Sequence, residues 1–129
     1  MNEAIRVLII DDDQLVRESI SAFLEDDGFI VESASSAEEA LARIESGHHD
    51  LCITDFSLPG MDGEELILSA YSLSPKTRFI MHSGVNFTPS AELELIGFTR
   101  ENVMSKPIIR LELLSERIHM LAGKPGVSE

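Results

Sequence analysis

Five polar or charged side chains lie at the ends of short apolar runs in this sequence. Asp11 and Asp12 follow one run, Asp55 ends a second, and Ser83 and Lys106 come after two more. Grouped carboxylates repel one another and either bind a proton or recruit a cation. A hydroxyl and an ammonium group instead hold anionic oxygen atoms. Brought together, these side chains could hold a phosphoryl group beside a divalent cation, with the Asp55 carboxylate as the nucleophile.

Mg²⁺ is the cation that this set of side chains favours. Hard divalent ions prefer carboxylate oxygens, whereas zinc would need Cys or His residues at ligand spacing, and the sequence contains no such pair. Asp13 stands beside the acidic pair, but an aspartate in front of a helical segment usually caps that helix. We therefore predict that Asp13 is an N-cap and not a metal ligand.

The apolar runs have the length and composition of buried strands. Each is bounded by charged residues or by residues that favour turns. The predicted strands are Ile5 to Ile10, Phe29 to Val31, Leu51 to Thr54, Phe79 to Met81, and Val103 to Met104.

Helical spacing of apolar residues marks the segments between these strands. It is clearest from Val16 to Phe23, Ala37 to Ile44, Leu66 to Leu73 and Leu111 to Leu121. A short fourth helix is predicted between Thr88, as its cap, and Gly97, with Pro89 in its first turn.

Alternating strands and helices predict an α/β fold, a doubly wound parallel sheet of five strands with helices on both faces. In such a sheet the loops after the strands meet at one edge, which places the five polar side chains together. His48 and His49 fall at the opposite edge, where we predict solvated turn residues. Cys52 lies within a strand and is predicted to be a small core residue.

Composition narrows the class of protein. The chain has 129 residues, enough for one domain, with 23 acidic and 10 basic residues and a formal net charge of −13. This charge disfavours direct binding to nucleic acid or to an anionic membrane. No apolar run is long enough to span a bilayer, and no signal peptide is recognisable, so we expect a cytoplasmic protein.

Four motifs occur in the order typical of one family. They are IIDDDQ, ITDFSLPGMDG, MHSG and MSKP. The chain resembles the receiver domain of two-component response regulators from residue 5 to about residue 121, with the flavodoxin-like fold of the chemotaxis response regulator. We expect residues 1–122 to form this domain and residues 123–129 to form a flexible tail.

The resemblance implies a role for each site residue. Asp55 would accept a phosphoryl group, Ser83 would hydrogen-bond to it and Lys106 would form a salt bridge with it. Mg²⁺ would be held by the carboxylates of Asp11, Asp12 and Asp55 and by the backbone carbonyl of Ser57. The family also implies a cis bond between Lys106 and Pro107.

The resemblance also implies partners. A histidine kinase or phosphotransfer protein would donate the phosphoryl group, and a downstream protein, an output domain or a second copy would receive the signal. The chain would not be a turnover enzyme, since it would catalyse only its own phosphorylation and dephosphorylation. Because the sequence ends at residue 129, we expect either a stand-alone receiver or a piece of a longer protein.

Val103 departs from the family pattern. The family usually has Tyr or Phe at this position, an aromatic residue that swings inward on phosphorylation, and valine is too small to do so. We therefore expect the conformational change to concentrate in the loop from Gly84 to Thr88 and in the short fourth helix.

Two other functions compete with this interpretation. An Mg²⁺-dependent phosphohydrolase of the haloacid dehalogenase type also uses a strand-end aspartate, but its second aspartate two residues later is Ser57 here, and the chain has no room for a cap domain. A receiver-like interaction domain that works without phosphorylation is the other alternative.

Overall fold

The central sheet is parallel and has five strands. The computed structural model describes residues 4–106, 108 and 110–122. The strands lie in the order β2-β1-β3-β6-β7. Their bounds are β1 Arg6–Ile10, β2 Ile30–Ala34, β3 Leu51–Asp55, β6 Arg78–Ser83 and β7 Val103–Ser105.

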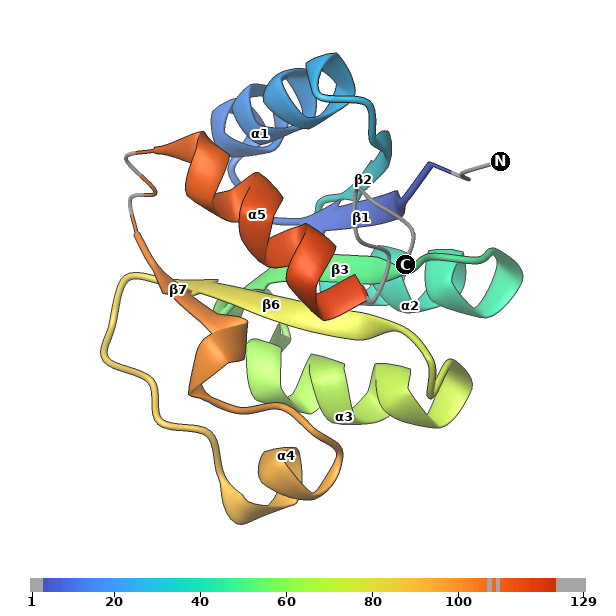
Figure 1. Cartoon of the computed structure of the whole chain (residues 1–129). Helices are drawn as coiled ribbons and strands as arrows, with labels where there is room; N and C mark the ends of the chain where they lie inside the picture. Colours follow the sequence, from blue (N-terminus) through green and yellow to red (C-terminus); the bar gives the residue numbers. More distant parts are fainter. Residues whose placement is uncertain (1–3, 107, 109, 123–129) are drawn as a thin grey trace, which may run out of the picture.

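Helices cover both faces of the sheet (Figure 1). On one face lie α1 and α5, and on the other lie α2, α3 and the short α4. The bounds are α1 Gln14–Asp26, α2 Ala37–Ser46, α3 Gly63–Leu73, α4 Ala91–Leu95 and α5 Leu111–Ala122, with a 3₁₀ turn at Arg100–Asn102. The predicted fold class is confirmed.

Alternation along the buried strands supplies a separate core for each face. In β1, Leu8 and Ile10 pack on the side of α2 and α3, whereas Val7 and Ile9 pack on the side of α1 and α5. Every residue of β3 is buried, because this central strand is covered on both faces. Cys52 belongs to the first of these cores, as predicted, and its burial raises the pKa of its thiol.

Two local features, a hairpin and a helix cap, differ from the prediction. A small antiparallel hairpin, β4 Ser57–Leu58 with β5 Met61–Asp62, follows β3. Its turn needs Gly60, whose φ is +80°. The N-cap of α4 is Ser90, whose side chain accepts a hydrogen bond from the Leu93 N–H, so the prediction of Thr88 as the cap and Pro89 in the first turn was wrong.

His49 is also not the solvated turn residue that we predicted. It is buried, and its Nε2 lies 2.7 Å from Oε1 of Glu32 on β2. His48 does remain exposed. The sequence pattern could not reveal the pairing of His49, because Glu32 is 17 residues away and becomes its neighbour only through the sheet.

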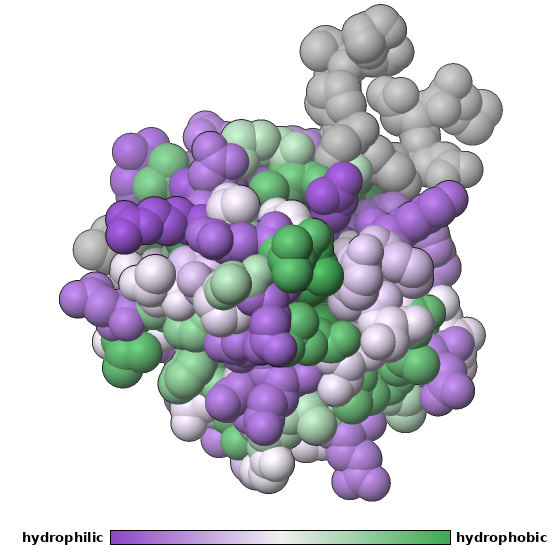
Figure 2. Space-filling model, turned by 90° about the horizontal axis from the view of Figure 1, so that it is seen from below, coloured by the Kyte–Doolittle hydropathy of each residue, from purple (hydrophilic) through white to green (hydrophobic). Residues whose placement is uncertain are grey.

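The surface on the side of α3 and α4 mixes hydrophobic and hydrophilic side chains (Figure 2). Its exposed apolar residues include Tyr71, Leu73 and Leu95. Among the described residues, no helix is long and apolar enough to cross a bilayer. The predicted tail at residues 123–129 and the predicted cis bond at Pro107 lie outside the described residues.

Candidate functional site

Asp55 is the last residue of the central strand β3, between β1 and β6. Its position is fixed by the start of α3, where the Gly63 N–H donates a 2.6 Å hydrogen bond to the Phe56 carbonyl. A Cβ atom on Gly63 would lie only 2.6 Å from the Asp55 carbonyl oxygen and 3.0 Å from the Cα of Phe56. Only glycine therefore permits this close approach.

Two carboxylates from the loop after β1 lie next to Asp55. Asp11, Asp12 and Asp55 can each offer one oxygen, and these oxygens lie within 4.8 Å of one another. Asp11 is buried and is held in place because the Asp13 N–H donates a 2.9 Å hydrogen bond to its Oδ1. Three hard oxygen donors at this separation fit a divalent ion such as Mg²⁺, which keeps several of its waters.

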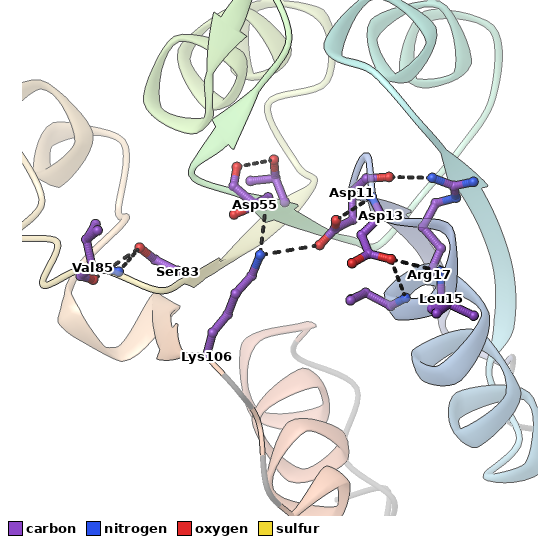
Figure 3. Close-up of polar contacts among 10 residues, drawn as sticks. Asp11, Asp13, Leu15, Arg17, Asp55, Ser83, Val85 and Lys106 are labelled. Carbon is purple, nitrogen blue, oxygen red and sulfur yellow. Dashed lines mark hydrogen bonds and ion pairs between the residues drawn. The ribbon is translucent and has the colours of Figure 1, made fainter.

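Lys106 reaches the same carboxylates from the end of β7. Its Nζ donates a hydrogen bond to Asp55 Oδ2 at 2.9 Å and lies 3.8 Å from Asp11 Oδ2. Figure 3 shows the side chain extended toward the space between the two acids. The Lys106 ammonium group offsets part of the negative charge and so reduces the repulsion among the three carboxylates.

Burial and the proximity of these charges together alter the pKa values of Asp11 and Lys106. Burial raises the pKa of Asp11, and the nearby Asp55 and Asp12 carboxylates add to this effect, although the Asp13 N–H and Lys106 oppose it. For Lys106, burial lowers the pKa, but the hydrogen bond with Asp55 and the charges of Asp11, Asp55 and Asp12 outweigh burial and raise it. Lys106 is therefore firmly protonated at neutral pH.

Ser83 ends β6 and is buried, but its hydroxyl is turned away from Asp55. The Oγ atom accepts a hydrogen bond from the Val85 N–H and donates one to the Val85 carbonyl, both at 3.1 Å. Figure 3 shows this pair on the opposite side of Lys106 from Asp11. The hydroxyl would have to exchange these partners to contact a group on Asp55.

His82 is the neighbour of Asp55 in the β3–β6 register. It is buried, and burial followed by the charge of Lys106 lowers its pKa to about 4, so the ring is neutral at pH 7. Its Nε2 has no hydrogen-bond partner among the described residues. A buried polar atom without a partner is uncommon in a folded protein.

The structure brings Asp11, Asp12, Asp55 and Lys106 into one cluster, as the sequence predicted. Asp13 is an N-cap, also as predicted, since its carboxylate accepts hydrogen bonds from the N–H groups of Leu15 and Val16. Ser57 lies in β4 and is exposed. The contribution of Gly63 could not be recognised from sequence, because a glycine after a turn gives no sign that a backbone oxygen lies against it.

A comparison with protein families matches residues 7–119 to the response regulator receiver domain. The chain is 40% identical over 62 residues to the two-component response regulator PhoP of Pseudomonas aeruginosa, which covers 48% of this chain and 28% of PhoP. It is 29% identical over 119 residues to the cell cycle response regulator CtrA of Brucella ovis, covering 92% of this chain and 50% of CtrA. The chain thus spans half or less of the length of these relatives.

Solved structures show the same likeness over nearly the whole chain. A CheY-like receiver domain protein of Methanospirillum hungatei has a TM-score of 0.80 and 32% identity, covering 94% of this chain and 95% of that one. The receiver domain of the hybrid histidine kinase CckA has a TM-score of 0.75 and 29% identity, covering 91% and 98%. The family match extends over the sheet and its acidic cluster. This chain therefore belongs to the response regulator receiver domain family.

Proposed function

We propose that Asp55 accepts a phosphoryl group in an Mg²⁺-dependent reaction and that the chain passes this signal on by a change of conformation. The observation that carries the proposal is the contact of Lys106 Nζ with Asp55 Oδ2 at 2.9 Å, beside two further carboxylates. A structural salt bridge would need only one acid. An excess of carboxylates around one lysine is instead suited to a cation and an incoming phosphoryl group.

The chain's own residues would perform distinct tasks. A carboxylate oxygen of Asp55 attacks the phosphorus atom, a new P–O bond forms, and the bond to the donor breaks with its electron pair leaving on the donor. Lys106 stabilises the phosphoryl oxygens by charge, and the Ser83 hydroxyl donates a hydrogen bond to one of them after leaving Val85.

Asp11, Asp12 and Asp55, with the Ser57 carbonyl, would hold Mg²⁺. The ion supplies charge neutralisation for the phosphoryl oxygens when it is bound. The carboxylate cluster supports this assignment for the three acids. For Ser57 the support is its place two residues after Asp55, at the start of the hairpin.

The phosphoryl donor in this proposal is a histidine kinase or a phosphotransfer protein, and the recipient of the signal is a downstream protein, an output domain or a second copy of the chain. Membership of the receiver family supports these classes of partner. The chain would catalyse only its own phosphorylation and dephosphorylation, and it would work in the cytoplasm without contacting nucleic acid or membrane directly.

Intact mass spectrometry after incubation with acetyl phosphate and Mg²⁺ tests the proposal. We expect one phosphoryl adduct per chain in the native protein and none in Asp55→Asn. Asp13→Asn is the matched control, because asparagine also caps a helix and Asp13 is not a proposed ligand. It should be phosphorylated like the native protein.

The same experiment separates the alternatives. An adduct that persists at the native yield in Asp55→Asn would contradict the choice of acceptor. No adduct in any variant would favour an interaction domain that works without phosphorylation. Continued release of phosphate over many turnovers with no adduct accumulating on the native protein would favour a phosphohydrolase.

A further inference from the structure

Arg17, in the first turns of α1, contacts the main chain of Asp11. Its Nη1 atom donates a 2.7 Å hydrogen bond to the Asp11 carbonyl oxygen. A hydrogen bond from a charged donor is stronger than one between neutral groups. Figure 3 shows the Asp11 carbonyl directed at Arg17 and the Asp11 carboxylate directed at Lys106. Arg17 therefore holds the loop after β1 from the side opposite the lysine.

This contact is not a by-product of ion pairing. Arg17 is half-buried in a groove between α1 and β2, and the lining of this groove includes three glutamates, Glu18, Glu25 and Glu32. An arginine in such surroundings could readily pair with a carboxylate. In the described part of the chain, however, Arg17 forms no ion pair. Its guanidinium group binds the main chain of the loop instead.

The Asp11 carbonyl belongs to the planar peptide unit that joins Asp11 to Asp12. Fixing this plane fixes the nitrogen and Cα atoms of Asp12, and with them the direction in which its carboxylate leaves the chain. Asp12 is exposed and makes no hydrogen bond of its own to the described residues. Its direction therefore depends on what holds the peptide units on either side of it.

Both of these peptide units are held. Arg17 binds the carbonyl of the unit before Asp12, and the N–H of the unit after it, which belongs to Asp13, donates a 2.9 Å hydrogen bond to Asp11 Oδ1. Arg17 is in turn anchored to the same segment, because its own N–H donates a 3.0 Å hydrogen bond to the Asp13 carbonyl. The start of α1 and the acidic loop thus fix each other.

Positioning and charge make opposite predictions for the effect of Arg17 on a bound cation. A guanidinium group has no lone pair with which to bind a metal ion, and its positive charge repels one. If charge were its only effect, removing Arg17 would strengthen the binding of Mg²⁺. A group that orients metal ligands has the reverse effect, because its loss lets the ligands move.

We propose that Arg17 is a positioning residue, which orients the carboxylates of Asp11 and Asp12 for Mg²⁺ through the main chain of Asp11. This role rests on the proposed function for the ion itself. The hold of Arg17 on the loop does not, and it can be measured without metal.

Isothermal titration with Mg²⁺ tests the role. In Arg17→Met, which keeps an unbranched stem but has no donor, the Mg²⁺ dissociation constant should rise about five- to tenfold, near the low end for loss of a group that orients metal ligands. Arg17→Lys keeps the charge and a donor on a shorter stem, so its affinity should lie between those of Arg17→Met and the native protein.

Arg78→Met is the matched control, because it removes the same charge at an exposed position. Arg78 begins β6, at the opposite end of the strand from the acidic cluster. Its replacement should leave Mg²⁺ affinity unchanged or slightly raised. Thermal unfolding establishes that each variant folds, and Arg17→Lys carries the comparison with the native protein if Arg17→Met does not. A loss of stability alone would leave the affinity of the folded protein unchanged.

Hydrogen exchange measured by NMR without metal gives a second readout. The Asp13 amide should exchange several-fold faster in Arg17→Met than in the native protein, because the loop that pairs it with Asp11 is released. Arg78→Met should exchange at this amide like the native protein.

Failure of this role and failure of the proposed function are distinguishable. If the native protein binds Mg²⁺ and Arg17→Met binds it equally or more tightly, the positioning role is overturned and the proposed function stands. Unchanged exchange at Asp13 in Arg17→Met would also overturn the role. A native protein that binds no Mg²⁺ would refute the proposed function, and the role of Arg17 toward the cation with it, even if the difference in exchange remained.

Discussion

The Ser83 hydroxyl and the main chain of Val85 hold each other through two hydrogen bonds, one in each direction, both 3.1 Å long. The hydroxyl is therefore occupied within its own loop. Turning it toward a phosphoryl group on Asp55 would break both bonds at once and free the loop that follows. Farther along that loop, Phe87 packs on Phe56, the residue after Asp55, with ring centroids 5.4 Å apart.

This arrangement predicts where phosphorylation changes the structure. With beryllofluoride as the phosphoryl mimic, we expect amide hydrogen exchange to change most across residues 84–100 and little at residues 103–104. Ser83→Ala should reduce the change in the loop, because no hydroxyl leaves Val85. Large changes at Val103 with none in α4 would contradict the prediction and show that the usual switch works without its aromatic residue.

Replacing Asp12, a proposed Mg²⁺ ligand, and replacing Lys106 should have opposite effects on Mg²⁺ binding. Asp12→Ala deletes a carboxylate, so we expect the Mg²⁺ affinity to fall about tenfold. Lys106→Ala deletes a positive charge next to Asp55 and Asp11, so the affinity should stay the same or rise. Isothermal titration calorimetry measures both, and the reverse order of affinities would mean that the cation does not bind at this cluster.

Gly63→Ala should destabilise the protein by about 1–3 kcal/mol, because its Cβ would lie 2.6 Å from the Asp55 carbonyl oxygen. Gly84→Ala is the matched control, since the nearest atom to a Cβ there is 4.0 Å away on the Lys106 side chain. Urea denaturation gives both free energies of unfolding. A loss in Gly63→Ala no larger than that in Gly84→Ala would show that the start of α3 can move away from the acceptor loop.

The pair formed by buried His49 and half-exposed Glu32 should make stability depend on pH. The hydrogen bond with His49 lowers the pKa of Glu32, so the folded state favours the charged carboxylate. The resulting stability is present above the ordinary pKa of glutamate and is lost as the pH falls through the lower pKa of the folded state.

Glu32→Ala should accordingly cost about 1 kcal/mol at pH 7, where His49 is left without its partner, and less below about pH 4. Glu45→Ala, an exposed position on α2, serves as the control and should show no such pH dependence. Urea denaturation at pH 7 and at pH 3.5 supplies the comparison. An equal loss at both values would mean that the charge of Glu32 contributes nothing.

The sequence was sufficient to predict the fold and the acidic cluster, because both depend on buried strands that alternate with helices along the chain. A residue just after a buried strand lies at one edge of a parallel sheet whatever its partners are, which is why Asp11, Asp55 and Lys106 could be placed together. The pairing of His49 with Glu32, the cap at Ser90 and the close approach at Gly63 depend on contacts between elements. Local spacing carries no information about those contacts, so they required the structure.

Lys106 and Asp55 are 51 residues apart in sequence. The lysine follows β7, which is one of the two edge strands of the sheet and the last of its five strands in chain order. On a ribosome, a chain that has emerged only as far as β6 would already present the acceptor aspartate and its acidic neighbours, yet it would lack their counter-cation. Under the proposed function, competence for phosphorylation therefore arises only when β7 has joined the sheet, and it marks the chains whose five-stranded sheet has been completed.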